Sequence, residues 1–223
     1  MSHVKHAVIA AAGLGSRLGM GKPKCLIEIG GMTILEHQLK LLDHIEDVRV
    51  VVGFEEEFVI DLVRQLRPET IIVRNPGYRS TTTLHSYAMG ASYVTEDCLF
   101  LDGDILFQQS SLEAFLNACQ PNQTLVGITP AKTKDAVFVH LNAQEQITAF
   151  SREQSSPYEW ANIVWISPRH FQQPGGAVFE RLKDYLPLSA KVIISNEIDT
   201  KEDMQEALSN LNQFNLRDKA FSV

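Results

Sequence analysis

The chain has 223 residues, of which 44% are hydrophobic, and this is enough for one well-buried α/β domain but short for two. Its formal net charge of −7 argues against a broad basic face for nucleic acid. The three cysteines are far apart and odd in number, which excludes a disulfide framework or a zinc spacing and favours a reducing, cytoplasmic setting. We see no signal peptide and no run approaching about 18 apolar residues, so we expect no membrane insertion.

Short apolar strands alternate with helices along the first part of the chain. Runs of β-branched and other apolar residues predict strands at residues 6–10, 48–52, 70–73, 98–101 and 124–128. Apolar residues at helical spacing predict helices over residues 34–42, 55–66, 84–93 and 111–119. This alternation predicts a single α/β domain over residues 1–223, a Rossmann-like three-layer sandwich with a mostly parallel central sheet. Such sheets bind ligands beyond the carboxyl ends of their strands.

A glycine-rich stretch, residues 10–24, follows the first strand directly and reads AAAGLGSRLGMGKPK. Backbone N–H groups in such a turn can approach a phosphate chain, and Arg17, Lys22 and Lys24 add three cations. The third glycine of a dinucleotide fingerprint comes one residue late, and Pro23 stands where a P-loop needs a hydroxyl. A tight turn without a ligand is the structural alternative. The three cations favour a nucleoside triphosphate.

This stretch, followed by Leu26, Ile29 and a Gly-Gly pair, resembles the signature of the sugar-phosphate nucleotidyltransferases. It is most similar to the small members that transfer CMP to phosphocholine, to aminoethylphosphonate or to related phosphorylated alcohols. The resemblance implies a GT-A-like nucleotidyltransferase fold, Mg²⁺ as cofactor, and CTP and a phosphorylated small molecule as partners. It implies Lys24 and Arg17 as catalytic residues. The loop residues that it places on the nucleotide phosphates are Ala11, Ala12, Gly13, Leu14, Gly15, Ser16 and Arg17.

Residues 75–87, NPGYRSTTTLHSY, lead from a predicted strand into a helix. The three threonines can cap that helix, or their hydroxyl and N–H groups can recognise a substrate at its positive end. We assign Thr82 to the nucleotide, and Thr81 and Thr83 to the acceptor. Arg79 is a further acceptor candidate, with a surface position as an equal alternative. The small cytidylyltransferases often have asparagines in this stretch, so the base and the acceptor stay open.

Asp102 and Asp104 follow the apolar strand at residues 98–101, and Gly103 lets the backbone turn between them. Magnesium takes one or two carboxylates and keeps its other positions for water and phosphate oxygens. The resemblance places Asp104 on the family's metal-binding aspartate. Asp102 would orient water or ribose instead, and we count it among the nucleotide-binding residues. A solvated Asp-Gly turn is the structural alternative.

From about residue 131 to 167 the helices give way to consecutive strands, predicted at residues 136–139, 146–149 and 162–166. We expect an antiparallel insertion that forms a wall or lid over the sheet on the acceptor side, because the resembling family binds its second substrate under such a segment. Trp160 and Asn162 are its acceptor-binding candidates. The face of Trp160 is suited to a quaternary ammonium such as choline, whereas Trp165 lies in an apolar strand and is expected in the core.

Residues 195–203, SNEIDTKED, resemble the family's last motif, in which an acidic residue completes the metal site. The resemblance assigns this role to Asp199. Capping of the helix predicted over residues 201 to about 211 is another role open to Asp199 or Thr200. Glu197 lies two residues before Asp199 and, on an extended strand, points to the same side, so we place it at the acceptor site.

These features predict transfer of a nucleoside monophosphate, with CMP from CTP favoured, to phosphocholine, an aminoalkylphosphonate or another phosphorylated alcohol, releasing pyrophosphate. The acceptor anion is already ionised, so positioning and charge neutralisation supply most of the rate and no general base is required. The alternatives are a hexose-1-phosphate uridylyl-, guanylyl- or thymidylyltransferase, a molybdopterin-type transferase, and a nucleotide-binding sensor without catalysis. The short chain and its Glu-Ile-Asp-Thr motif favour a CTP enzyme. The oligomeric state is not predicted.

Overall fold

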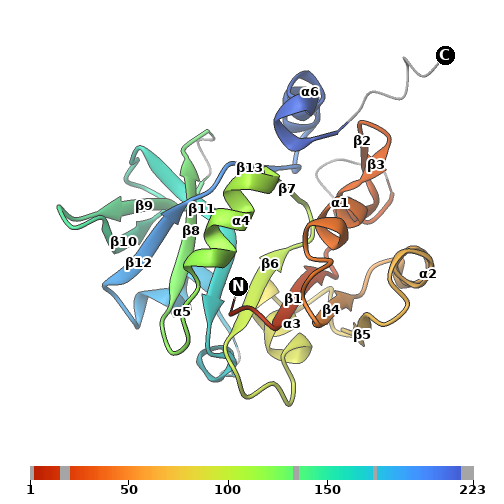
Figure 1. The fold of residues 1–223 in the computed structure, drawn as a ribbon, viewed down its shortest axis with the longest axis horizontal. Coiled ribbons are helices and arrows are strands. Elements are labelled where there is room, and N and C mark those ends of the chain that lie inside the picture. Colours follow the sequence, from red (N-terminus) through yellow and green to blue (C-terminus); the bar gives the residue numbers. More distant parts are fainter. Residues whose placement is uncertain (1–2, 16–20, 133–135, 173–174, 217–223) are drawn as a thin grey trace.

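The computed structural model describes residues 3–15, 21–132, 136–172 and 175–216. Its largest sheet has nine strands in the order β5-β4-β1-β6-β11-β8-β12-β10-β9 (Figure 1). These strands are β1 (His6–Ala11), β4 (Asp47–Val52), β5 (Ile71–Arg74), β6 (Cys98–Asp102), β8 (Leu125–Pro130), β9 (Phe138–Leu141), β10 (Gln146–Ser151), β11 (Tyr158–Ile166) and β12 (Leu188–Val192). Two short pairs lie outside this sheet, β2 (Glu28–Ile29) with β3 (Met32–Thr33) and β7 (Ile105–Phe107) with β13 (Ser195–Glu197).

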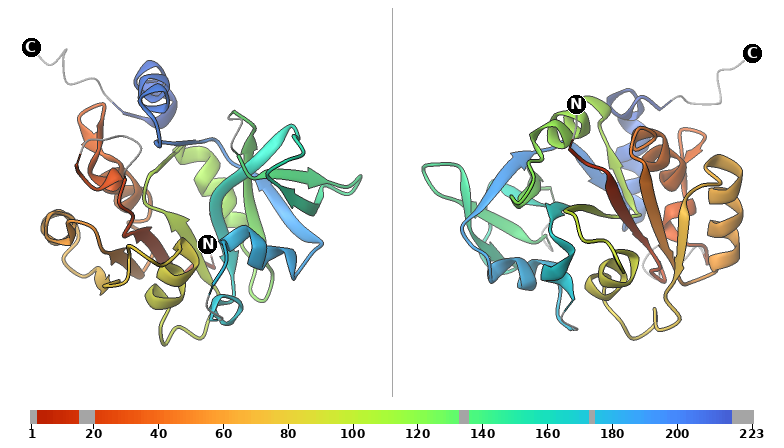
Figure 2. Two further views of the ribbon diagram at one scale, coloured as in Figure 1. Left: turned by 180° about the vertical axis from the view of Figure 1, so that it is seen from behind. Right: turned by 60° about the horizontal axis from the view of Figure 1, so that its bottom comes forward.

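Helices cover both faces of the large sheet, which confirms the three-layer α/β architecture (Figure 2). They are α1 (Ile34–Leu41), α2 (Glu56–Leu66), α3 (Thr83–Gly90), α4 (Gln109–Ala118), α5 (Val178–Lys183) and α6 (Lys201–Ser209). Helices α1, α2 and α4 pack on one face together with Ala7 and Ile9, while α3 and α5 pack on the other with Val8. Consecutive side chains of a strand point to opposite faces, and β1 is apolar from Ala7 to Ala11 because both of its faces are covered. No helix in the described ranges is long and apolar enough to span a bilayer.

The sheet is mixed. Strands β5, β4, β1 and β6 run parallel, as does the β8–β12 pair, whereas β11 is antiparallel to both of its neighbours, β6 and β8. The segment near residues 131–167 is antiparallel, as expected, but it does not lie over the sheet as a lid: its strands belong to the sheet itself, and residues 159–162 form one wall of the cavity described below. The reason is that Ile163 and Trp165 pack into one core cluster while Val164 and Ile166 pack into the other. A strand that is apolar on both faces belongs in the interior of a sheet.

The C-terminal segment returns to the edge of the sheet where β1 and β6 end. Strand β13 pairs antiparallel with β7, and Glu197 lies opposite Ile105. Helix α6 follows β13 at one end of the molecule (Figure 1). A third apolar cluster, which includes Ile29, Ile198 and Ala207, packs α6 against the β2–β3 pair. This pairing brings two sequence motifs, separated by almost a hundred residues, to one place.

Candidate active site

A cavity of about 790 Å³ opens at the carboxyl ends of β1 and β6. Its walls come from the glycine loop, the segment before α3, the turn after β6, the first half of β11 and the segment from β13 to α6. Among the described residues, nearly all of the sequence-predicted site residues line it: Ala11, Ala12, Gly13, Leu14, Gly15, Lys24, Thr81, Thr82, Thr83, Asp102, Asp104, Trp160, Asn162, Glu197 and Asp199. The predicted position, beyond the carboxyl ends of parallel strands, agrees with this cavity.

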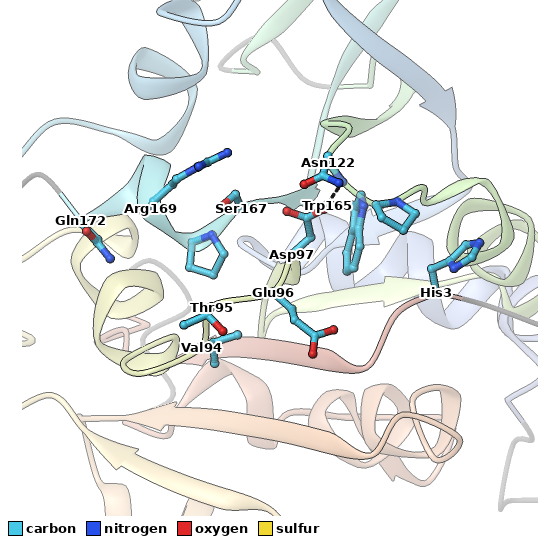
Figure 3. A pocket seen from close by; sticks show the side chains of 12 residues that line it. His3, Val94, Thr95, Glu96, Asp97, Asn122, Trp165, Ser167, Arg169 and Gln172 are labelled. Carbon is cyan, nitrogen blue, oxygen red and sulfur yellow. Dashed lines mark hydrogen bonds between the residues drawn. The ribbon is translucent and has the colours of Figure 1, made fainter.

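A second hollow, of about 480 Å³, lies at the opposite edge of the sheet (Figure 3). Asp97, Asn122 and Trp165 are among its lining residues, and polar groups of all three bond to the protein itself. The Asn122 backbone N–H donates to Asp97, and Nε1 of Trp165 donates to the Gln120 carbonyl. None of the sequence-predicted site residues lines this hollow. The larger cavity is therefore the candidate site.

Three charged side chains meet at the centre of the cavity. The ammonium of Lys24 donates to Oδ2 of Asp104 at 3.0 Å and also to Oδ1 of Asp199. Each of the three side chains is less than a fifth exposed, at 18%, 19% and 16%. Burial alone would lower the pKa of Lys24, but the two carboxylates raise it above its ordinary value. Lys24 is therefore a fixed cation next to the glycine loop.

The turn after β6 holds Asp104 in place. The Gly103 N–H donates to the Ala10 carbonyl at 2.9 Å, and a Cβ at Gly103 would lie 3.0 Å from that same oxygen. From α1, Nε2 of the buried Gln38 donates to the carbonyls of Asp102 and Ile105, both at 2.8 Å. The close approach of β1 explains why glycine stands between the two aspartates.

Asp199 is held by the first turn of α6. The hydroxyl of Thr200 accepts from the Asp203 N–H, and the Asp203 carboxylate accepts from the Thr200 N–H at 2.7 Å, which forms a capping box. The Asp203 carboxylate also accepts from the Asp199 N–H at 3.1 Å. Thr200 and Asp203 thus serve the helix, and the Asp199 carboxylate faces Lys24 instead.

Asp102 is held by a hydrogen bond from Tyr87 of α3. The fully buried Tyr87 hydroxyl donates to Oδ1 of Asp102 at 2.6 Å. Burial first, and then the charge of Asp104, raises the pKa of Asp102 to about 7, although Tyr87 and Lys24 pull it down. The sequence offered no signal for Tyr87, because it sits on the apolar face of a helix and lies fifteen positions before Asp102.

The described part of the glycine loop, Ala12 to Gly15, forms the wall beside Lys24. Gly15 has a φ of +61°, and a Cβ there would lie 3.1 Å from Cγ of Lys24, so glycine is required at this position. Ser16 and Arg17 lie outside the described residues. Lys22 is exposed and does not line the cavity.

The three threonines at the start of α3 line the cavity but make no capping hydrogen bond with their side chains. Thr82 is the N-cap residue, and its hydroxyl donates to the Gly176 carbonyl at 2.9 Å instead. The Thr81 hydroxyl accepts from Asn75 and donates to the Gly77 carbonyl, both at 3.0 Å, so it stabilises the turn. Thr82 therefore joins the start of α3 to the segment that precedes α5, and Thr83 is the first residue of α3.

The structure does not bring Arg79 into the cavity. Arg79 is exposed, and its guanidinium lies 5.3 Å from the ring centre of Tyr78, which does line the cavity. Arg79 therefore has the surface position, which the sequence left open as an equal alternative to acceptor binding.

Strand β11 supplies the far wall. Trp160 is only 8% exposed and packs in the core, so the cavity meets little of the ring, and Trp165 is in the core as expected. Asn162 has a φ of +50° and lies where the β11–β8 register shifts. Its side chain donates to Oε2 of Glu197 at 3.1 Å. Although Glu197 is exposed to the cavity, the surrounding walls partly desolvate it and, with the charges of Asp104 and Asp102, raise its pKa above the ordinary value.

Two further cations line the cavity that the sequence did not indicate, Lys132 and Arg152. The Lys132 ammonium donates to the Ser195 carbonyl and to Oδ1 of Asn196, and so ties the end of β8 to β13. Desolvation lowers its pKa, against the pull of nearby acidic groups. The Arg152 guanidinium lies 5.2 Å from the ring centre of Phe179. Both follow strands in polar loops, where a single basic residue is ordinary, so no local pattern marks them.

Sequence comparisons show which known proteins this chain is similar to. Residues 7–163 match the family model of the MobA-like NTP transferase domain. The chain is 39% identical over 115 residues to the bifunctional protein GlmU of Methanococcus vannielii, which covers 50% of this chain and 27% of that protein. It is 31% identical over 160 residues to the CMP-5'-(3-aminopropyl)phosphonate synthase of Streptomyces rubellomurinus, covering 65% and 26% respectively. The chain thus spans about a quarter of the length of these two relatives.

A solved structure shares the fold. The CTP:phosphocholine cytidylyltransferase of Streptococcus pneumoniae superposes with a TM-score of 0.76, over 92% of this chain and 98% of that one. The two sequences are 17% identical, so this similarity shows the nucleotidyltransferase fold and nothing finer.

Proposed function

The chain belongs to the MobA-like NTP transferase family, and we propose that it transfers a nucleoside monophosphate from a nucleoside triphosphate to a phosphorylated small molecule, releasing pyrophosphate. The position of Lys24 carries this proposal. Its ammonium lies between Asp104 and Asp199 and beside the glycine loop. Attack of one anion on another needs preorganised positive charge at the reacting phosphorus, and this is the place where the cavity supplies it.

CTP is the proposed donor, and phosphocholine, an aminoalkylphosphonate or another phosphorylated alcohol is the proposed acceptor. One relative is named as a CMP-phosphonate synthase, and a protein of the same fold uses CTP and phosphocholine. The acceptor side of the cavity supports a substrate with both charges. Glu197 and Glu159 line it along with Lys132 and Arg152.

Asp104 and Asp199 fit a magnesium ion. Both carboxylates face one position, because both accept from the same ammonium. In the described ranges, no three His, Cys, Asp or Glu side chains converge on a metal position, and Mg²⁺ needs only one or two carboxylates besides water and phosphate oxygens. When bound, the ion would neutralise phosphate charge and orient the reacting groups.

The chain's own groups divide the remaining work in this proposal. The backbone from Ala11 to Gly15, with Ser16 and Arg17 of the undescribed segment, holds the β- and γ-phosphates. Lys24 stabilises the negative charge that grows on the α-phosphoryl group. Asp102, fixed by Tyr87, orients the nucleotide. No group acts as a general base, because the attacking phosphate or phosphonate oxygen is already ionised.

The acceptor is proposed to lie between α3 and β11. Arg152 and Lys132 take the place of Arg79 as its cationic partners, since both line the cavity and Arg79 does not. Thr81, Thr83 and the Asn162–Glu197 pair contribute polar groups. Because Trp160 is mostly buried, it acts in this proposal as a rigid edge of the pocket rather than as an open cage for an ammonium. The three cysteines are free and buried, in support of a cytoplasmic setting.

Two alternatives make different predictions. A hexose-1-phosphate transferase would use the same Lys24, Asp104 and Asp199 with another base and a sugar acceptor. A sensor without catalysis has no need of a cation held between two acidic groups beside the glycine loop, so the observed arrangement favours an enzyme.

The test is pyrophosphate release with magnesium, in which CTP, UTP, GTP, ATP and dTTP are each combined with pools of phosphorylated alcohols, phosphonates and sugar 1-phosphates. We expect release with CTP and one of the first two pools, and no release from Asp104→Asn. Release with a sugar 1-phosphate would replace the proposed acceptor by the hexose alternative. Nucleotide binding without release from any pair would support the sensor.

A further inference from the structure

Lys24, Asp104 and Asp199 form one ion-paired group, in which a single ammonium lies between two carboxylates. Two carboxylates this close repel each other unless a cation lies between them, and Lys24 supplies it. The group is shielded, since each side chain is less than a fifth exposed. Charge-assisted hydrogen bonds of this kind are stronger than neutral ones, and partial burial strengthens them further.

A divalent ion held by Asp104 and Asp199 would compete with Lys24 for their carboxylate oxygens. Oδ2 of Asp104 and Oδ1 of Asp199 both point at the Lys24 ammonium. A divalent ion that bridges these oxygens has to displace an ammonium from them, because two cations in van der Waals contact repel strongly in a shielded site. A metal ion and the Lys24 ammonium would therefore compete for this position.

The glycine loop offers Lys24 another partner. A Cβ at Gly15 would lie 3.1 Å from Cγ of Lys24, so the loop lies directly against the aliphatic part of the Lys24 side chain. A triphosphate held by the loop would present oxygens beside the ammonium, and Lys24 would exchange carboxylate oxygens for phosphate oxygens.

We propose that Lys24 is an internal counterion that keeps divalent metal off Asp104 and Asp199 until a nucleoside triphosphate draws its ammonium away. Metal and nucleotide then bind as a pair, and the protein alone has low affinity for the metal. This inference rests on the proposed function for its second half, the exchange of partners. Its first half, the block to free metal, rests on the ion pairs alone.

The test is Mn²⁺ binding to the full chain without nucleotide, followed by electron paramagnetic resonance. We expect Lys24→Met to bind Mn²⁺ at least tenfold more tightly than the unaltered protein. Lys24→Arg keeps the charge, so its Mn²⁺ affinity should stay within about threefold of that of the unaltered protein. The matched control is Lys5→Met, which removes an exposed lysine paired with Glu96 on the opposite edge of the sheet. The gain from Lys24→Met disappears when it is combined with Asp104→Asn.

Equal Mn²⁺ affinity for Lys24→Met and the unaltered protein would overturn the inference, provided that circular dichroism shows both folded. If Lys24→Met does not fold, Lys24→Gln removes the charge while keeping a polar end, and the same comparison decides. A second arm adds the α,β-methylene analogue of whichever nucleotide supports transfer. The unaltered protein should then gain Mn²⁺ affinity by tenfold or more. If no nucleotide supports transfer, the proposed function fails while the metal-only comparison still decides this inference.

Discussion

The hydroxyl of Tyr87 donates a hydrogen bond of 2.6 Å to Oδ1 of Asp102, and so a buried aromatic of α3 fixes a carboxylate at the end of β6. The Tyr87 ring is itself held 5.1 Å from that of Phe100. Asp102 lines the cavity, and this bond involves only one of its two carboxylate oxygens. Tyr87 is thus a positioning residue for Asp102.

Tyr87→Phe removes this hydroxyl and keeps the ring. We expect the KM for CTP to rise about tenfold with a smaller change in kcat, as is typical for the loss of one hydrogen bond to a charged group. Steady-state kinetics with varied CTP and saturating acceptor measure this. Tyr185→Phe is the control, since the Tyr185 ring packs on His170 away from the cavity. An unchanged KM in Tyr87→Phe would show that Asp102 is held without Tyr87.

Asn162 combines a left-handed backbone with a hydrogen bond to Glu197, and two substitutions separate these contributions. Asn162→Gly keeps the φ of +50° accessible, whereas Asn162→Ala loses stability by roughly 1 kcal/mol, because a Cβ without a local hydrogen bond disfavours this conformation. Both variants free Glu197, so the KM for the acceptor should rise in both. Urea unfolding and acceptor titration measure the two effects. Equal stability of the two variants would argue against backbone strain at this bulge.

The sequence predicts those parts of the fold and the site that depend on short, contiguous sequence patterns. The apolar run before Gly13, the Asp102–Asp104 turn and the Glu197–Thr200 motif each carry their own spacing, and all three meet in the cavity. Their convergence depends on β13 pairing with β7, and no local pattern encodes that pairing.

Strand pairing also explains the largest difference between the predicted fold and the structure, which is the position of the strands near residues 131–167. The strand at residues 162–166 is visible from its composition, but its position between β6 and β8 depends on which strands it contacts. A run of four apolar residues shows that both faces of this strand are covered, but it does not show which strands lie on either side of it. Lys132 was missed for the same reason, because its role arises from contact with β13.

Asp47 gives a prediction about pH that is independent of the site. Burial would raise the pKa of its carboxylate, but hydrogen bonds from Arg49 and His6 lower it below the ordinary value. Because the pKa of Asp47 is lower in the folded state, its contribution to stability is complete above the pKa of the unfolded state, about 3.9. This contribution is lost as the pH falls through the pKa of the folded state. Asp47→Asn should therefore lose about 1–3 kcal/mol at pH 7, and the difference should shrink below pH about 4.

Urea unfolding between pH 7 and pH 3.5 measures this difference. Glu96→Gln is the control, because its ion pair with Lys5 is 58% exposed on both sides and such pairs contribute little. A difference for Asp47→Asn that stays constant down to pH 3.5 would mean that shape rather than charge explains the loss.

Lys24 and Asp104 give the most direct prediction about catalysis. In the proposed reaction both act on the charge that develops in the transition state, so Lys24→Ala and Asp104→Ala should each lower turnover by on the order of a hundredfold or more. Their ion pair makes the two losses interdependent, and the double variant should lose less than the product of the single losses. Pyrophosphate release at saturating substrates measures all three variants, with Lys5→Met as the control. A loss under threefold in either single variant would remove that residue from the proposed mechanism, and fully multiplicative losses would show that the ion pair has no part in turnover.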